Sequence, residues 1–420
     1  MRMTGGSSVA EVQRRRFHIR APAIMGLANL PFGFYGAAVL ISVPQLLAAR
    51  GVPQPTIAAI TATAMIPTFC GFLLAPILDV HFNRRSYAIF FGLLTAALAV
   101  LALVSIGHLG RFTALLVAGF LAANLFYNAL GGWLGDIVGK GDEGKLGASF
   151  TIGNVGGFGA GAISFITLVR WLPEPFGAIA VGGLIATPVL LCLFIPPSPT
   201  LRRGVKESFA ALFRDIAQLI RKPAVLRTLF MFGLPAASFA LTNSLGGLGA
   251  RFGASEQFVA VMAETGVTVA AILSSMMVPL ILKRVSPRPL YLAVGSVGAL
   301  FTLSLILMPR TPAVFALALV GENVFQAAAF VVECTIVFRS IGDDNPLAAT
   351  QFALLQAATS FPITYMQAVD GGAFARGGMD GMFAVDAGLS LVACAVLLPL
   401  VLRWKRIERT AVPLLQPLPA

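Results

Sequence analysis

Long apolar runs separated by short polar connections make up most of this chain. The run LLTAALAVLALVSI, for example, holds no charged residue. A membrane-spanning helix needs about 20 apolar residues, whereas a membrane β-barrel shows alternating segments of about ten residues. The pattern therefore predicts helices that cross a membrane. We place twelve of them, at residues 21–49, 56–78, 86–107, 112–134, 146–169, 174–196, 226–249, 257–282, 289–309, 312–338, 347–369 and 381–402.

The composition strengthens this interpretation. Hydrophobic residues make up 57% of the chain and charged residues 11%. Soluble domains carry roughly 25% charged residues. The mean hydropathy is +0.85. We therefore expect an all-α integral membrane protein with the lipid bilayer as its surroundings.

Positive charge is distributed unevenly along the chain. Of the 30 Lys and Arg residues, 24 fall in the two termini and the even-numbered connections, and the net charge is +12. Positive residues mark the cytoplasmic side, so both termini are predicted to be cytoplasmic. Nucleic-acid binding would need this charge on one folded surface with interleaved aromatic residues, so we expect no such partner. The odd-numbered connections carry a single Arg each, namely Arg50, Arg111, Arg170, Arg251, Arg310 and Arg376.

The longest polar interval, residues 197–227, separates six expected helices from six others. Within it, apolar residues such as Phe209, Leu212 and Ile216 recur at helical spacing beside Arg and Lys residues. This pattern predicts an amphipathic helix on the inner membrane surface. We divide the chain into a cytoplasmic tail (1–20), a six-helix bundle (21–196), a basic linker (197–225), a second six-helix bundle (226–403) and a second tail (404–420).

Two six-helix halves joined by a basic linker resemble the major facilitator superfamily, in which the substrate binds between the halves near the midplane of the membrane. The stretch LLAPILDVHFNRRSYAIFF also resembles the conserved cytoplasmic motif of that superfamily, without its usual glycines. There an Asp at a helix end precedes an Arg pair, as Asp79 precedes Arg84 and Arg85 here. The resemblance implies that these residues form charge-assisted bonds that close an inner gate.

The stretch TQFALLQAATSF is similar to the eleventh helix of the AmpG-type muropeptide permeases, whose relatives include acetyl-CoA transporters and some siderophore permeases. Three further pieces resemble this branch in the same order: LPFGFYGAAVLISVPQLLAARGV, GGWLGDIVGKGDEGKLGASFTIGNVGGFGAGA and GENVFQAAAFVVE. We add Asp136 and Glu143, from the second piece, to the expected gating residues. Two departures are that many muropeptide permeases carry more than twelve spans and that Glu264 stands where a basic or neutral residue is expected.

The eleventh expected helix carries an unusual number of amide and hydroxyl groups. At 100° per residue, Gln356, Ser360 and Gln367 fall within about 40° of one another, and Thr359 lies about 60° away. An unsatisfied amide in lipid costs several kcal/mol, so this face must meet other protein groups or a water-filled cavity. Hydrogen bonding between helices, worth about 0.6 kcal/mol per bond, is one reading. The nearby Pro362 favours the other, a transport cavity.

The tenth expected helix carries two carboxylates on one face. Glu322, Gln326 and Glu333 lie within about 40° of one another, and the two carboxylates are about 16 Å apart along the axis. A carboxylate inside a membrane is functional by default, and burial favours its neutral form, so it can take up and release a proton. This predicts proton coupling, with Glu264 as a third candidate. The alternative is that Glu333 only pairs with Arg339.

Other polar residues within the expected helices can hydrogen-bond a sugar, a peptide or a catecholate. They include no fixed cation, which argues against a multiply charged phosphate and hence against acyl-CoA. Together with Gln326, Gln356, Thr359, Ser360 and Gln367 they form the predicted substrate-binding set. These further residues are Asn29, Tyr35, Asn124, Tyr127, Asn128, Asn154 and Asn243.

A membrane-embedded enzyme would need a nucleophile, a His constellation or a metal cluster in the spans. The chain has only His18, His81 and His108, all in expected loops or termini, and neither HExxH nor GxSxG occurs. We expect no enzyme, no cofactor and no metal, while a non-transporting sensor stays open.

The sequence as a whole predicts a monomeric, proton-coupled secondary transporter of the inner (plasma) membrane that imports a mid-sized polar solute. A cell-wall muropeptide is the first candidate. A siderophore importer of the same branch and a multidrug or solute efflux pump are the alternatives.

Overall fold

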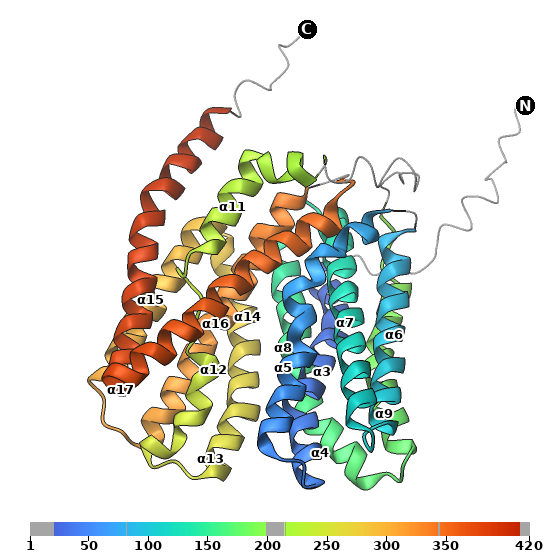
Figure 1. The fold of residues 1–420 in the computed structure, drawn as a ribbon. Helices are drawn as coiled ribbons and strands as arrows, with labels where there is room; N and C mark the ends of the chain where they lie inside the picture. The colour runs from blue at the N-terminus through green and yellow to red at the C-terminus, as the bar shows by residue number, and fades with distance from the viewer. Residues whose placement is uncertain (1–20, 81, 199–213, 215, 343–344, 412–420) are drawn as a thin grey trace, which may run out of the picture.

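The computed structural model describes residues 21–80, 82–198, 214, 216–342 and 345–411. Every regular element in these residues is a helix (Figure 1). The predicted all-α class is therefore confirmed. Part of the predicted amphipathic linker helix, including Phe209 and Leu212, lies outside the described residues. Residues 216–221 of the linker are helical, and Leu219 among them is buried.

The first half begins with an irregular span, because several prolines and glycines interrupt regular helix geometry there. It consists of α2 (Pro22–Met25), η1 (Gly26–Asn29), α3 (Leu30–Ala37), η2 (Ala38–Ser42) and α4 (Val43–Ala49). The second span ends in two short 3₁₀ turns. The remaining elements of this half are α5 (Gln54–Cys70), η3 (Gly71–Leu73), η4 (Ala75–Asp79), α6 (Arg84–Val104), α7 (Leu109–Ile137), α8 (Glu143–Trp171), α9 (Phe176–Ala186) and η5 (Thr187–Leu193).

The second half ends in one long element with two passes. This element, α17 (Ala348–Ala411), turns back at Gly378, whose φ of 62° and ψ of −155° are not helical. Figure 1 shows its first pass running obliquely and its second pass returning to the C-terminal end. The preceding elements are α11 (Pro223–Gly233), α12 (Thr242–Leu245), η6 (Gly246–Phe252), α13 (Glu256–Val261), η7 (Met262–Gly266), α14 (Val267–Leu282), α15 (Pro287–Ile306) and α16 (Pro312–Ile341).

The seventh span differs from the continuous helix predicted over 226–249. It stops after Gly233, because Pro235 lacks an N–H and forces Leu234 into an extended conformation with φ −97° and ψ 148°. Ten stretches in the described residues are long and apolar enough to cross a membrane. Nine of these make single passes, the tenth makes two within α17, and the broken seventh span completes the twelve.

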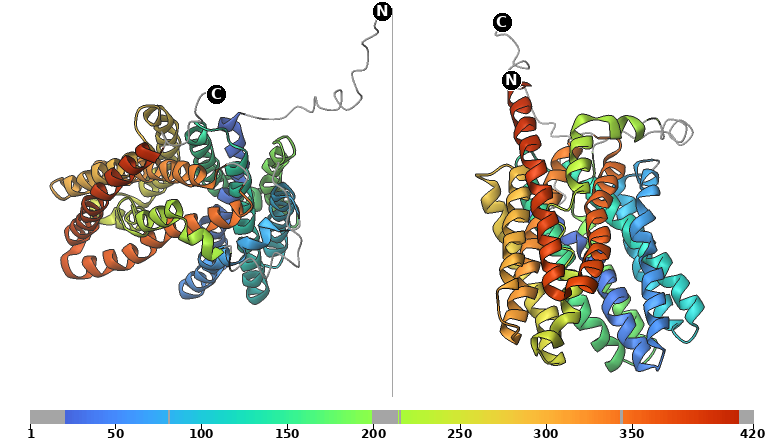
Figure 2. Two further views of the ribbon diagram at one scale, coloured as in Figure 1. Left: turned by 90° about the horizontal axis from the view of Figure 1, so that it is seen from above. Right: turned by 60° about the vertical axis from the view of Figure 1, so that its left-hand side comes forward.

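The two halves lie side by side in the view from above (Figure 2, left). We call the side at which α6 begins and α7 ends the inner side, after its predicted orientation, and the opposite side the outer side. At the junction, α7 packs against α16 and α17, α8 packs against α14 and α16, and η4 packs against α17. Glycines permit close approach here: a Cβ on Gly132 would lie 2.4 Å from the Cα of Ala349.

Candidate functional site

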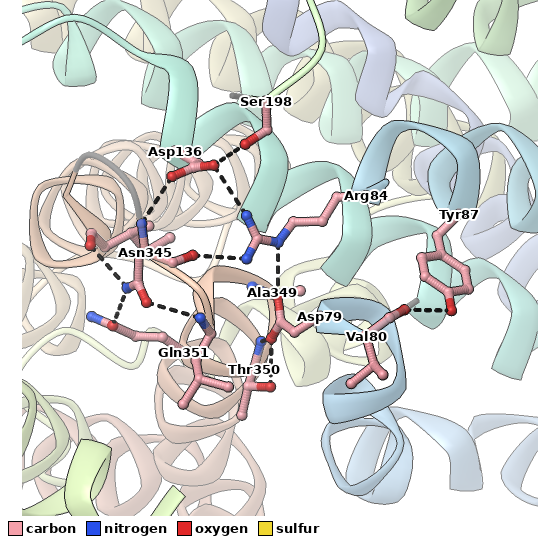
Figure 3. A network of polar contacts seen from close by, with 12 residues as sticks. Asp79, Val80, Arg84, Tyr87, Asp136, Ser198, Asn345, Ala349, Thr350 and Gln351 are labelled. Carbon is pink, nitrogen blue, oxygen red and sulfur yellow. Dashed lines mark hydrogen bonds and ion pairs between the residues drawn. The ribbon is translucent and has the colours of Figure 1, made fainter. Parts of the chain in front are cut away.

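A polar network joins the two halves at the inner side (Figure 3). Asp79, at the end of η4, accepts hydrogen bonds from the backbone N–H groups of Ala349 at 3.0 Å and Thr350 at 2.8 Å. The Thr350 hydroxyl donates a third bond at 2.7 Å. Because Ala349 and Thr350 begin α17, the carboxylate of the first half also faces the positive end of the dipole of that helix.

Arg84 extends this network in three directions. Its Nε donates to Asp79 at 2.8 Å, and its Nη1 donates to Asp136 at 3.1 Å. Its Nη2 donates to the backbone oxygen of Asn345 in the second half at 2.7 Å, and the N–H of Asn345 returns a bond to Asp136 at 3.1 Å. Ser198 also donates to Asp136. The guanidinium side chain is only 6% exposed, so the network is buried between the halves at the inner side.

The other two predicted gating residues behave differently from each other. Glu143 of α8 lies 3.6 Å from Arg339 of α16, so this ion pair also crosses between the halves. Arg85 donates to the backbone oxygen of Leu193 at 2.7 Å and stays within the first half. Arg339 therefore faces Glu143 rather than Glu333, its partner in the alternative considered from the sequence.

An aromatic layer lies next to the network, on the side that faces the middle of the membrane. Phe150 of α8 contacts Phe338 of α16 and Phe352 of α17, with ring centroids 5.6 and 5.8 Å apart. Tyr127 of α7 packs on Phe352 at 5.2 Å. The three phenylalanines are at most 1% exposed. Phe352 is four residues into α17, which places this layer about 6 Å from the start of that helix.

A cavity of about 220 Å³ follows this layer and is lined by both halves. Eight residues of the predicted substrate-binding set line it, and so does one of the predicted proton-coupling carboxylates. From the first half these are Asn29, Asn124, Tyr127, Asn128 and Asn154, and from the second half Glu333, Gln356, Thr359 and Ser360.

Several polar atoms around this cavity lack a partner among the described residues. The Gln356 Nε2 donates to the Tyr127 hydroxyl across the two halves, but its Oε1 is buried without a donor. Asn29 donates to the backbone oxygen of Phe150 at 3.1 Å, and its Oδ1 is likewise unpaired. The Thr151 hydroxyl also has no partner. Such atoms can bind the hydroxyl or amide groups of a solute.

Four residues of the predicted substrate-binding set lie away from this cavity. Tyr35 is fully buried in the first half and donates to the backbone oxygen of Leu116 at 3.1 Å. Gln326 donates to the Thr242 hydroxyl at 2.7 Å, inside the second half. Asn243 and Gln367 are exposed and do not line the cavity.

The three predicted proton-coupling carboxylates occupy separate environments. Glu322 is fully buried, its Oε1 accepts a hydrogen bond from Thr302 of α15, and its Oε2 has no donor among the described residues. Glu333 lines the cavity. Its carboxylate has no hydrogen-bond partner within the described part of the chain. Glu264 lies half-buried in η7, away from the cavity.

Sequence reasoning missed a pair of aspartates in the second half. Asp370 and Asp386, on the two passes of α17, are 1% and 4% exposed, and their carboxyl groups lie close to each other. Neither oxygen of Asp370 receives a donor from the described residues, nor does the Oδ1 of Asp386. Two ionised carboxylates close together repel each other, and a proton shared between them relieves this repulsion.

Comparison with known proteins identifies the fold of the chain. Neither the models of known protein families nor the sequences of curated proteins give a match. The proton:xylose symporter XylE is 15% identical over 90% of this chain and 95% of its own, with a TM-score of 0.65. The human organic anion transporter MFSD10 is 16% identical over 90% of this chain and 99% of its own, with a TM-score of 0.66. The E. coli fucose:proton symporter FucP is 17% identical over 91% of this chain and 99% of its own, with a TM-score of 0.63. All three are transporters rather than enzymes, and the likeness shows that this chain has the major facilitator fold.

Proposed function

We propose that this multi-pass membrane protein is a secondary transporter that moves a mid-sized polar solute by alternating access. The observation that carries the proposal is the cavity between the halves, which is lined from both sides and lies behind a closed inner network. In this mechanism the network formed by Asp79, Arg84 and Asp136 breaks when the halves rock, and the cavity then opens to the inner side. We further propose import across the inner (plasma) membrane, with the inner side defined by the orientation that the Lys and Arg distribution predicts.

The cavity lining favours a solute rich in hydroxyl and amide groups. No Lys or Arg is among the described residues that line the cavity, and Glu333 is the single carboxylate there. Phe32 and Tyr127 also line the cavity, and their rings stack with centroids 4.4 Å apart. They offer an aromatic surface to a ring of the solute. These features suit a saccharide unit better than a multiply charged phosphate. Together with the resemblance to AmpG-type permeases, they make a cell-wall muropeptide the first candidate.

The size of the cavity places a condition on this proposal. Sites for drug-sized ligands measure about 300–1,000 Å³, whereas this cavity measures about 220 Å³. A muropeptide therefore requires the halves to separate further on the outer side before it binds. A siderophore is the alternative solute, because the amide and hydroxyl groups of the same lining could hold its polar groups. Uptake of labelled anhydro-muropeptide and of labelled siderophore, in cells that lack their own permeases, separates the two candidates.

Proton coupling is assigned in this proposal to the buried carboxylates of the second half. Glu322 and the aspartate pair lie outside the solute cavity, where a proton can bind without direct contact with the solute. Protonation removes the charge whose burial is unfavourable. Glu333 is instead assigned to solute binding, since it lines the cavity.

Replacement of Glu322 by Gln tests the coupling. Gln is permanently neutral, so proteoliposomes with Glu322→Gln should lose accumulation driven by a pH difference. They should retain exchange of solute, because exchange does not require the carboxyl group to release a proton. Glu333→Gln serves as the comparison and should change the KM while accumulation persists. Accumulation by Glu322→Gln proteoliposomes under a pH difference alone would contradict the assignment of Glu322.

A further inference from the structure

A second cavity lies at the inner end of the second half, separate from the solute cavity. It measures about 310 Å³ and is formed where α11 and α15 begin and where α16 and the second pass of α17 end. Three cations line it, namely Arg288, Arg339 and Lys405, and no Asp or Glu is among its described lining residues. Cationic side chains in such a lining attract an anion.

A buried hydroxyl group adds an unused donor to this cavity. Ser286 precedes α15, and its Oγ is buried without a partner among the described residues. Pro287 and Pro289 at the start of α15 have no backbone N–H, so side chains supply the donors here. Cations and a hydroxyl group together form a site for an oxyanion such as a phosphate.

The surface beside the cavity indicates what carries that phosphate. Large apolar side chains on α11 and on the second pass of α17 are exposed at the same end of the molecule. Leu226 and Phe230 of α11 are 55% and 48% exposed, and Leu398 and Leu402 of α17 are each 47% exposed. In a membrane protein these residues face acyl chains. The site therefore combines a basic pocket for an anionic head group with an apolar flank. Basic pockets between helices at the inner side bind acidic lipid head groups.

We propose that this cavity binds the head group of an anionic phospholipid. The phosphate contacts Arg288, Lys405 and the Ser286 hydroxyl, and the acyl chains lie along α11 and α17. This site is independent of the identity of the transported solute.

Arg339 connects the lipid site to the closed inner side. It lines the cavity and also forms the ion pair with Glu143 of the first half, at 3.6 Å. A bound phosphate competes with Glu143 for this guanidinium group and weakens one of the contacts that hold the halves together. Anionic lipid thus favours opening of the inner side.

Lipid binding to the purified full-length protein tests the site directly. Native mass spectrometry would count bound phosphatidylglycerol and phosphatidylcholine, each added separately, and inorganic phosphate would be added as a competitor. Arg288→Gln combined with Lys405→Gln should weaken phosphatidylglycerol binding by about 30-fold, and Lys405→Gln alone by about fivefold. The matched control is Arg284→Gln combined with Arg403→Gln, which removes two exposed cations outside the cavity lining and should change binding by less than about threefold.

The sharing of Arg339 has its own test. Glu143→Gln releases Arg339 and should tighten phosphatidylglycerol binding several-fold, whereas Asp142→Asn removes the same charge one residue away and should not. Three results would overturn the proposal: equal binding of both lipids, equal loss in the cavity variants and the control, or full displacement by inorganic phosphate. An equal effect of Glu143→Gln and Asp142→Asn would overturn the link to the inner side. These measurements use no solute, so their failure is distinguishable from failure of the proposed transport.

Discussion

Two aspartates at opposite ends of the first pass of α17 are buried in contrasting ways. The Asp79 carboxylate meets a guanidinium group, two backbone N–H groups and a hydroxyl group at the start of this pass. Asp370, near its end, meets another carboxyl group and no donor among the described residues. A buried charge is stable only when donors replace its water. Donors from both halves therefore surround Asp79, whereas the Asp370 and Asp386 pair has only unpaired oxygens at Asp370 and at the Oδ1 of Asp386 among the described residues.

The comparison predicts the largest effect at Asp79. Asp79→Asn leaves Arg84 with one carboxylate instead of two and removes a charge from the start of α17. We expect the inner-closed state to lose about 3–5 kcal/mol, as when one partner of a buried ion pair is removed. Spin-label distances across the inner side should shift toward an open population. The control is Asp142→Asn, because the Asp142 carboxylate pairs with Lys145 at an exposed site. Unchanged distances in Asp79→Asn would disprove that Asp79 holds the inner side closed.

A smaller effect is expected where the same closure depends on shape instead of charge. Gly132→Ala places a Cβ 2.4 Å from the Cα of Ala349, so α7 and α17 must move apart. Overpacking of this kind costs about 1–3 kcal/mol, and here it acts on the inner-closed state. Spin-label distances across the inner side should again report opening. Gly139→Ala is the control, because its Cβ would meet no atom within 4 Å; equal responses would show that close packing at Gly132 does not hold the gate.

The smallest effect on stability is expected at Asp370. Asp370→Asn supplies an amide donor to Asp386. The free energy of unfolding, measured by thermal unfolding in detergent, should therefore fall by less than about 1 kcal/mol or increase. The infrared band of a protonated carboxyl group should weaken in this variant and in Asp386→Asn. It should persist in Asp380→Asn, which removes an exposed carboxylate. A destabilisation as large as that of Asp79→Asn would mean that Asp370 is a paired anion after all.

The sequence predicted the fold well because the length of apolar runs is a strong signal in a bilayer. It missed the break in the seventh span, where the tertiary structure accommodates the non-helical turn that Pro235 favours. Helical periodicity also identified one face of the first pass of α17, and Gln356, Thr359 and Ser360 of that face line the cavity.

Periodicity was less informative where the neighbours of a helix change along its length. Glu322 and Glu333 share one face of α16 by angle, yet Glu322 meets Thr302 inside the second half and Glu333 meets the cavity. The pairing of Asp370 with Asp386 depends on how two passes fold together, which a pattern within one helix does not report. Residues of the cavity could therefore be predicted by face, but not by depth or partner.

The course of α17 has a mechanical consequence. Its first pass, about 45 Å long from Ala348 to Gly377, is held by Asp79 at one end, lines the solute cavity through Gln356 and carries Asp370 near the other end; its second pass reaches Lys405. The non-helical turn at Gly378 separates the two passes, so the first pass can tilt by itself and carries three of these attachments. Free energies of binding that are coupled through this tilt are reciprocal. In the proposed mechanism, a proton that favours one tilt binds more tightly when bound solute already favours the same tilt.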